Sequence, residues 1–199
     1  MRNTSFSESE MSLIDKLIYH LRIRPVRPHL TGVDCFVDIG CDYDAKLLRT
    51  LIKKYNVSKA VGIDLIIDPN IKNPKLRFEQ KNINTEKINL ANEEADMITA
   101  LALIEHLDTP EHLLNESFRI LKHGGKLILT TPSPWAKPIL DFLAHRLRII
   151  SRREIDDHKN YFNKEQLLEM LLSAGFKENK IKIRSFLFGF NNLVCCVKD

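Results

Sequence analysis

The chain has no uninterrupted apolar run long enough to cross a membrane, which requires about 18 residues or more. Its N-terminal stretch, MRNTSFSESE, has no apolar core of the kind that a secretory signal peptide needs. Linkers, internal repeats and low-complexity tracts are also missing from the 199 residues. We therefore expect one domain over residues 1–199 and a cytoplasmic location.

The chain has few cysteines, and neither its basic nor its acidic residues clearly predominate. Cys35, Cys41, Cys195 and Cys196 show no C-x-x-C spacing, and three of them lie within apolar segments. We therefore expect buried reduced thiols and no metal site. The 30 basic and 26 acidic residues give a net charge of +4 and a pI near 8.8. This balance is too even to indicate a nucleic-acid partner.

The chain does have apolar runs that alternate with helical patterns, and with 44% hydrophobic residues it can bury a full core. Residues 33–39 are rich in β-branched and aromatic side chains and predict a strand, although periodicity alone also fits a buried helix segment. Residues 47–52 repeat leucine and isoleucine at helical spacing, and residues 60–65 predict a second strand. Two strands joined by a helix imply parallel pairing with a right-handed crossover.

The turn between the first strand and this helix is poor in glycine. Dinucleotide-binding turns hold a pyrophosphate on glycines spaced G-x-G-x-x-G, but here Gly40 is followed by Asp42 and Asp44. Like charges at short range disfavour a pyrophosphate, whereas a cofactor that carries a sulfonium fits them. Asp64, at the end of the second strand, suits the two hydroxyls of a ribose. These residues favour a sulfonium nucleoside over NAD.

Five segments, in their order along the chain, resemble the class I S-adenosylmethionine-dependent methyltransferases. The resemblance implies an α/β, Rossmann-like doubly wound fold with a mostly parallel seven-stranded sheet, an antiparallel C-terminal hairpin strand and helices on both faces. It also implies S-adenosylmethionine as the cofactor. The segments are VDIGC at 37–41, VGIDL at 61–65, ADMITALALIEHL at 95–107, ESFRILKHGGKLILTTPS at 116–133 and YFNKEQLLEMLLSAGF at 161–176.

The remaining pattern supplies further elements of such a fold. Residues 7–23 predict a helix that ends near Pro25, within an N-terminal helical cap over 1–30. Thr109-Pro110-Glu111 predicts the start of another helix, with Thr109 as its cap, and Gly124 predicts its end. Three more strands are predicted at 77–83, 96–101 and 126–131.

Beyond Pro132, prolines interrupt the alternation and predict a substrate-side insertion over 133–160. Residues 135–150 predict an apolar helix that runs into a basic stretch, 145–153. One interpretation is a lid helix with a solvated charged face. The other is contact of residues 135–153 with an anionic membrane surface or an anionic substrate.

The C-terminal part predicts a capped helix followed by a hairpin. Asn163 and Gln166 have the spacing of a capping box, and Gly175 with Phe176 predicts the end of that helix. The loop 189–192 separates the last two predicted strands, and it is so short that it can join only antiparallel neighbouring strands. The two hairpin strands are predicted at 180–188 and 193–198.

The candidate cofactor site combines residues from the strand ends. Asp38 lies inside an apolar run, where burial is costly without a hydrogen bond, and the resemblance places it near the methionine end of the cofactor. The resemblance also places Asn82 and Ile83 against the adenine. Asp42 and Asp44 also fit as caps of the helix start. The predicted cofactor-binding residues are Asp38, Gly40, Asp42, Asp64, Asn82, Ile83 and Leu101, the last of which also fits ordinary core.

Two histidines are candidates for removing a proton from a methyl acceptor. His106 follows the fourth strand in the sequence IEHL, and His158 lies in DDH within the insertion. A surface or helix-capping histidine is the simpler interpretation of His106, and His158 would have to fold over the crevice to take part. We expect methylation of an oxygen or nitrogen of a small molecule or of a cell-surface glycan or lipid precursor. Two alternatives stay open, a module that binds S-adenosylmethionine or S-adenosylhomocysteine without transfer, and an NAD-dependent oxidoreductase.

Overall fold

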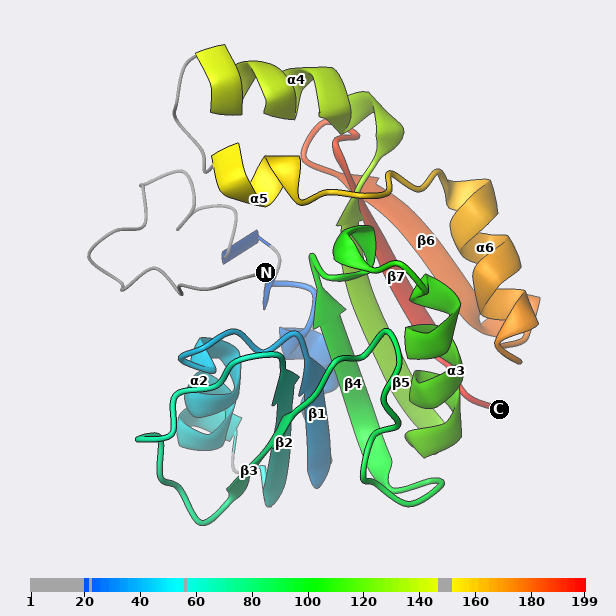
Figure 1. Ribbon diagram of the computed structural model, residues 1–199. Helices are drawn as coiled ribbons and strands as arrows, with labels where there is room; N and C mark the ends of the chain where they lie inside the picture. The colour runs from blue at the N-terminus through cyan, green and yellow to red at the C-terminus, as the bar shows by residue number, and fades with distance from the viewer. Residues whose placement is uncertain (1–19, 22, 56, 147–151) are drawn as a thin grey trace.

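The computed structural model describes residues 20–21, 23–55, 57–146 and 152–199. Its centre is a seven-stranded sheet in the order β3-β2-β1-β4-β5-β7-β6 (Figure 1). None of the helices in these ranges is long and apolar enough to span a bilayer. The strands are β1 (Cys35–Ile39), β2 (Lys59–Asp64), β3 (Leu76–Gln80), β4 (Ala95–Leu101), β5 (Leu121–Pro132), β6 (Ile181–Phe186) and β7 (Asn191–Val197).

The sheet is parallel from β3 to β5 and ends in an antiparallel hairpin. β1 pairs in parallel with β2 and β4, while β7 pairs antiparallel with both β5 and β6. β7 is thus inserted between β5 and β6 and runs against the other six strands. This arrangement confirms the predicted Rossmann-like fold and its hairpin. It also brings the ends of β1, β2 and β4 to one edge of the sheet, where ligands bind in such folds.

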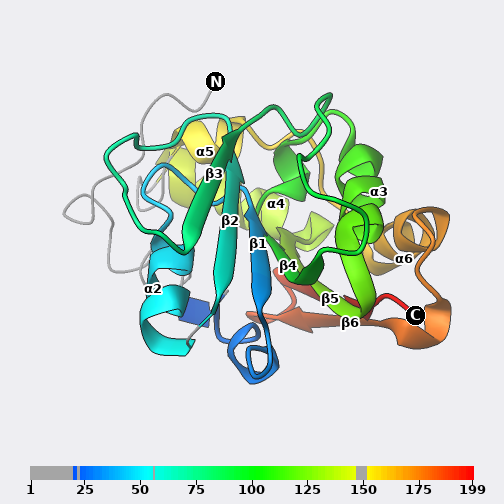
Figure 2. The same cartoon turned by 90° about the horizontal axis from the view of Figure 1, so that it is seen from below.

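Helices cover both faces of the sheet, with α2 on one face and α3 and α6 on the other (Figure 2). Beyond the ends toward which β1 and β4 point lie α4 and α5 (Figure 1). The α-helices are α2 (Lys46–Tyr55), α3 (Pro110–Ile120), α4 (Lys137–Asp141), α5 (Arg152–Asp156) and α6 (Lys164–Ser173). Shorter elements are the 3₁₀ helices η1 (Arg27–His29), η2 (Ile104–His106), η3 (Pro134–Ala136) and η5 (Glu178–Lys180) and the π-helix η4 (Phe142–Arg146).

The core forms two layers because successive residues of a strand point to opposite faces. On β1, Val37 and Ile39 belong to the layer under α3 and α6, while Phe36 belongs to the layer under α2. All five residues of β1 are buried, as expected for a central strand. Each large apolar side chain buried in these layers contributes about 1.5–3 kcal/mol of transfer free energy. The residues that α2 buries against the sheet are Leu47, Leu48 and Leu51.

The cysteines are free thiols, as predicted. Cys35, Cys41 and Cys196 are buried, and Cys195 is half-buried. Burial raises the pKa of all four thiols, so each is held in its neutral, less nucleophilic form at neutral pH.

The end of α3 differs from the prediction that Gly124 closes it. The helix stops at Ile120, because its last carbonyls accept hydrogen bonds from another segment rather than from a helical continuation. The N–H groups of Glu93 and Glu94 donate to the carbonyls of Arg119 and Ile120, at 3.1 Å and 2.9 Å. Gly124, with φ +77°, instead turns the chain inside β5. The helix begins at Pro110 as predicted.

Thr109 is the N-cap residue of α3, as predicted, but its side chain makes no hydrogen bond to the helix. Its Oγ1 donates a 2.7 Å hydrogen bond to the carbonyl of Asn84. The side-chain oxygen of Asn84 accepts in turn from the backbone N–H groups of Asp108 and Thr109. Thr109 therefore fixes the start of α3 to the loop after β3.

The capping box of α6 is confirmed. Asn163 Oδ1 accepts from the N–H of Gln166 at 2.8 Å, and Gln166 Oε1 accepts from the N–H of Asn163 at 3.0 Å. At the other end Gly175 has φ +107°, and the N–H of Phe176 donates to the carbonyl of Leu171. The ring of Phe176 packs edge-on against that of Phe118, with centroids 5.0 Å apart. The sequence thus predicted both ends of this helix.

Other element ends shift by a few residues. β3 ends at Gln80, three residues before the predicted end. β6 ends at Phe186, because Leu187 and Phe188 take left-handed φ values of +51° and +56° that turn the chain into β7. The helix predicted over 135–150 is helical up to Arg146. The rest of that segment, 147–151, and most of the predicted helix over 7–23 lie outside the described residues.

Candidate active site

The ends of β1 and β2 place the predicted cofactor residues beside one another. Asp38 of β1 pairs with Gly62 of β2, two residues before Asp64, which ends β2. Gly40 follows β1 directly, and its N–H donates a 2.8 Å hydrogen bond to the carbonyl of Ile63. The parallel register therefore brings three of the predicted residues to the carboxyl edge of the sheet.

Asp38 is a buried carboxyl group. Thr99 of β4 donates a 2.6 Å hydrogen bond from Oγ1 to Asp38 Oδ1. Burial raises the pKa of Asp38 well above its usual value, and the neighbouring carboxylates of Asp42 and Asp64 raise it further. The hydrogen bond from Thr99 acts in the opposite direction. A positive charge beside Asp38 would favour its ionised form.

The turn after β1 keeps the backbone conformation of a glycine turn although it holds few glycines. Gly40 has φ +77°, and Asp42 has φ +60° in the left-handed region that aspartate tolerates better than most residues. Ala45 also has a positive φ, +46°, so α2 begins only at Lys46. The chain therefore completes a left-handed turn before α2 begins, and the capping of this helix by Asp42 or Asp44 stays a prediction.

Asp64 fixes this turn through its carboxylate. Oδ2 accepts from the N–H of Asp42 at 2.9 Å, and Oδ1 accepts from the N–H of Leu65 at 2.7 Å. An ionised carboxylate has about four lone-pair positions, so both oxygens can accept further hydrogen bonds. Asp64 is half-exposed, which leaves it accessible to a diol. The same side chain thus holds the turn and faces the edge where a ribose would lie.

The chemistry of this edge fits S-adenosylmethionine. Asp38, Asp42 and Asp64 gather carboxylates around one glycine turn, and their repulsion adds to the effect of burial, which is the main cause of the raised pKa of Asp38. A ligand with a sulfonium and an ammonium group relieves that repulsion, whereas a pyrophosphate increases it. Gly40 also lies close to Leu103, since a Cβ at residue 40 would sit 3.0 Å from Leu103 Cδ1. A side chain at position 40 would therefore collide there as well as strain the backbone.

Three residues that were predicted to contact the cofactor lie in surroundings that differ from one another. Asn82 is exposed after β3, and its Oδ1 accepts from the N–H of Asn84 at 3.1 Å, so its carbonyl already holds a local turn. Ile83 is buried in the core layer under α3 and α6. Leu101 ends β4 and is half-buried against the other core layer. All three follow strands whose ends meet at the cofactor edge.

The chain after β4 makes a sharp, strained turn. Ala102 has φ +52°, a conformation that costs of the order of 1–3 kcal/mol for a residue with a side chain. Its N–H donates to both the carbonyl and the Oγ1 of Thr130, at 2.9 Å and 3.1 Å. These bonds hold the turn and direct the chain into η2, which carries Glu105 and His106.

The segment after α5 is fastened to η2. The backbone N–H groups of Lys159 and Asn160 donate to the carbonyl of Glu105, at 2.9 Å and 3.0 Å. Asn160 Nδ2 also donates to the carbonyl of Leu107 at 2.8 Å. These bonds join residues more than fifty positions apart and bring His158 next to His106.

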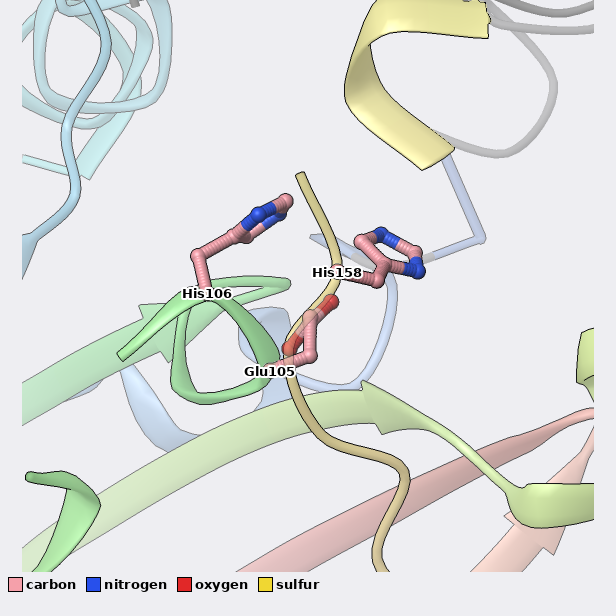
Figure 3. A group of neighbouring side chains, drawn as sticks. All are labelled: Glu105, His106 and His158. Carbon is pink, nitrogen blue, oxygen red and sulfur yellow. The ribbon is translucent and has the colours of Figure 1, made fainter. Parts of the chain in front are cut away.

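The two candidate histidines lie together at this junction (Figure 3). Their ring centroids are 4.8 Å apart with the rings at 69°. His106 Nδ1 lies 3.1 Å from the carbonyl oxygen and 3.3 Å from Oδ2 of Asp157, and the His106 side chain is 11% exposed. His158 Nδ1 lies 3.1 Å from Tyr161 Oη. His106 is thus mostly buried rather than a surface histidine, and the role of either ring as a base stays a prediction.

Residues that the sequence did not single out complete this cluster. Glu105 is fully buried, with its carboxylate between η2 and the chain that carries His158 (Figure 3). Burial, together with the negative charges of Asp141 and Glu105, raises the pKa of Tyr161 to about 12. Asp157 orients His106. The one available signal was the adjacency of Glu105 to His106, because the contacts of Asp157 and Tyr161 depend on long-range packing.

A family model described as a methyltransferase domain matches residues 15–179. The mitochondrial ubiquinone biosynthesis O-methyltransferase of Dictyostelium discoideum is 26% identical to this chain, over 60% of this chain and 42% of the relative. The chain therefore spans less than half of the length of this curated relative.

Solved structures share the fold at low sequence identity. An S-adenosylmethionine-dependent methyltransferase from Archaeoglobus fulgidus is 16% identical with a TM-score of 0.68, over 92% of this chain and 94% of that one. A possible histamine N-methyltransferase from Thermotoga maritima is 18% identical with a TM-score of 0.65, over 92% and 90%. A complex of the Haloferax volcanii Trm112 methyltransferase activator with its methyltransferase gives a TM-score of 0.66 at 14% identity, over 92% and 93%. Since the family model covers most of its length, the chain belongs to the class I S-adenosylmethionine-dependent methyltransferases, and its cofactor is S-adenosylmethionine.

Proposed function

We propose that this methyltransferase acts on an oxygen or nitrogen of a small molecule or of a glycan or lipid precursor. The observation that carries the proposal is the oriented histidine pair, His106 and His158, at the junction beyond β4. This junction lies past the same sheet edge that gathers Asp38 and Asp64. A protein that only bound the cofactor would have no need of two oriented imidazoles on its acceptor side.

Methyl transfer from a sulfonium is an in-line displacement, so the protein chiefly aligns the two reactants and excludes water. When bound, S-adenosylmethionine supplies an electrophilic methyl group on its sulfur. In the proposed site Asp64 accepts from the ribose hydroxyls, while Asp38 and Asp42 offset the positive charge of the cofactor. Gly40 permits close approach, and Asn82, Ile83 and Leu101 border the nucleoside.

Proton removal from the acceptor is assigned in this proposal to His106. With Nδ1–H directed at Asp157, the ring has its lone pair on Nε2 and can accept a proton. The carboxylate of Asp157 then stabilises the imidazolium that forms. His158, held by Tyr161, is the second candidate for the same step.

The same layout supports a domain division. We propose one methyltransferase domain over 1–199, in which 133–160 forms the acceptor side and 1–30, most of which lies outside the described residues, forms a cap. The insertion contributes η3, α4, η4 and α5, which lie beyond the sheet edge (Figure 1). Its last residues supply Asp157 and His158 to the acceptor cluster. The protein is proposed to act in the cytoplasm.

Weak contact with a membrane surface is part of the proposal, because the insertion exposes an apolar stripe. Trp135, Ile139 and Phe142 follow one another at helical spacing and are exposed, Trp135 at 81%. Phe188, 98% exposed, lies in the β6–β7 turn, which the hydrogen bond from Ser133 Oγ to the carbonyl of Gly189 ties to the start of η3. Aromatic side chains beside basic residues favour an anionic lipid surface.

A module that binds the cofactor without transfer is the alternative. Asp42 in place of a turn glycine, and Leu103 close above Gly40, are the observations that favour it. The NAD-dependent alternative is not retained, because the carboxylates of the turn oppose a pyrophosphate and the family uses S-adenosylmethionine.

The test uses methyl-labelled S-adenosylmethionine with an extract of cellular small molecules and lipids as the acceptor pool. We expect labelled product with the wild-type chain and at least about a hundredfold less with His106→Ala, since general-base catalysis contributes about 10²–10⁴-fold. The matched control is His123→Ala, which removes an exposed imidazole paired with Glu93. Tight binding of S-adenosylhomocysteine without any labelled product would favour the binding module.

A further inference from the structure

Glu105, His106 and His158 form a group whose composition suits a metal ion. Each offers one ligand atom, and these atoms all lie within 4.8 Å of one another. Ligands bound to one cation at about 2.0–2.2 Å lie about 3–4.4 Å apart, so small side-chain rotations bring the three into range. The absence of C-x-x-C spacing predicted no metal site, but that argument concerned cysteines and did not address histidines far apart in the sequence.

We propose that Glu105, His106 and His158 bind a divalent transition-metal cation, and that this cation coordinates the hydroxyl oxygen of the methyl acceptor. The inference rests on the proposed function and changes the role of His106 within it from base to ligand. It also selects an oxygen acceptor over a nitrogen acceptor.

The orientation of both imidazoles supports the site. Metal-binding histidines almost always donate their second ring N–H to a carboxylate, a carbonyl or another polar group. His106 Nδ1 faces the carbonyl and the carboxylate of Asp157, and His158 Nδ1 faces the hydroxyl of Tyr161. When Nδ1 carries the proton, each ring has its lone pair on Nε2, which is the form that coordinates a cation.

The surroundings hold the three side chains in place. Glu105 is fully buried, so a cation beside it would offset the cost of burying its charge. The bonds from Lys159 and Asn160 to the carbonyl of Glu105 lock the two parts of the site together. Figure 3 shows Glu105 and His106 on η2 projecting toward the segment that carries His158.

The donor set indicates the kind of metal. Two imidazoles and one carboxylate suit Zn²⁺, Mn²⁺, Fe²⁺ or Co²⁺ and leave coordination positions open for water or substrate. Asp157 and Tyr161 already bond to the histidines and serve as supporting groups. Three protein ligands with open positions are typical of catalytic rather than structural sites.

The cation would promote the loss of the proton from the acceptor. Coordination stabilises the oxyanion, so the O–H bond breaks and the proton passes to solvent water. The oxygen then forms a bond to the methyl carbon while the carbon–sulfur bond breaks. The electron pair of that bond stays on sulfur, and the sulfonium becomes a neutral thioether. No oxidant or reductant takes part.

The experiment measures metal binding directly, on the full chain without an affinity tag and after removal of metals with a chelator. Zn²⁺ is titrated by calorimetry, and Co²⁺ is added in parallel because its visible absorption reports the ligands. We expect stoichiometric binding by the wild type, with at least about a tenfold loss of affinity in His158→Ala and in Glu105→Gln. His123→Ala, which removes a histidine–glutamate pair elsewhere, should bind as the wild type does.

The outcomes separate this inference from the proposed function. Absence of stoichiometric binding, or equal affinity in Glu105→Gln, overturns the metal site, and the Co²⁺ spectrum of the wild type decides the matter if a variant fails to fold. Methyl transfer that survives metal removal also overturns it, yet leaves the proposed function with His106 as base. Stoichiometric metal binding without any labelled product from the metal-loaded protein would sink the proposed function alone.

Discussion

The Oγ1 hydroxyl of Thr99 donates a 2.6 Å hydrogen bond to Asp38 Oδ1 and links β4 to β1 within the buried sheet. Asp38 is thereby held at the edge where β1 ends. Its burial, and the carboxylates of Asp42 and Asp64, raise its pKa well above the usual range. A buried carboxyl group with a raised pKa beside a cationic cofactor couples folding, binding and pH.

The raised pKa of Asp38 predicts a pH dependence of stability that Asp38→Asn removes. The folded state favours the protonated carboxyl, so its stabilising contribution is present below the unfolded pKa of about 3.8 and is lost as pH rises through the higher folded pKa. Asparagine keeps an acceptor for Thr99 and carries no charge. The variant should therefore gain stability relative to the wild type as pH rises. Urea unfolding over a pH series measures this difference, and a difference that stays constant with pH contradicts it.

Gly62→Ala should destabilise the protein. A Cβ at this position would lie 2.8 Å from the ring of Phe78 and 2.9 Å from Cys41 Sγ, both closer than real contacts allow. Overpacking of this kind costs about 1–3 kcal/mol in the free energy of unfolding. Denaturant unfolding measures the loss, and the double variant with Phe78→Leu should recover part of it. If Gly62→Ala left the free energy of unfolding unchanged, the strand would be able to shift without cost.

The capping box of α6 gives a local prediction. Asn163→Ala removes the hydrogen bond to the N–H of Gln166 and should lower the free energy of unfolding by about 1 kcal/mol. Glu169→Ala, at an exposed position inside the same helix, should change it by less than about 0.5 kcal/mol. Equal effects of the two substitutions in urea unfolding would mean that the cap contributes nothing.

The exposed aromatic residues predict binding to anionic lipid. Trp135→Ala combined with Phe188→Ala should weaken partitioning onto phosphatidylglycerol vesicles at least about tenfold, since each ring contributes about 1.5–3 kcal/mol when buried. Leu172→Ala, which removes an exposed leucine on α6, is the matched control. Co-sedimentation measures the partitioning. The membrane proposal fails if the wild type does not bind, or if the double variant binds equally well.

Local patterns allowed most of the fold to be predicted. The capping box of α6 and its glycine end depend on residues a few positions apart, so the sequence showed both. The end of α3 could not be predicted in this way. It depends on Glu93 and Glu94, which approach the helix only after the sheet has formed. Gly124 was a plausible end for α3, but its positive φ instead turns the chain inside β5.

The candidate site likewise has parts that local sequence patterns predict and parts that depend on long-range packing. The position of Asp64 was predictable, because it ends an apolar strand at the carboxyl edge of a parallel sheet, while its contact with a ribose stays a prediction. The left-handed backbone of Asp42 and the bond from its N–H to Asp64 were not predictable, since they arise only when the turn packs against the end of β2. The pairing of His106 with His158 requires the hydrogen bonds from Lys159 and Asn160 to Glu105, which no sequence pattern reveals.

The most direct test of the cofactor site is calorimetric titration of S-adenosylmethionine into the wild type, Asp64→Ala and Asp34→Ala. Asp34 is an exposed carboxylate that precedes β1, at the opposite edge of the sheet, so its loss should leave the dissociation constant unchanged. Asp64→Ala should lose most of the affinity, at least about tenfold, because a charged hydrogen-bond acceptor contributes about 1.5–3 kcal/mol. Asp64→Asn, which keeps one acceptor oxygen, should fall between the two. An unchanged dissociation constant in Asp64→Ala would contradict this account of the site.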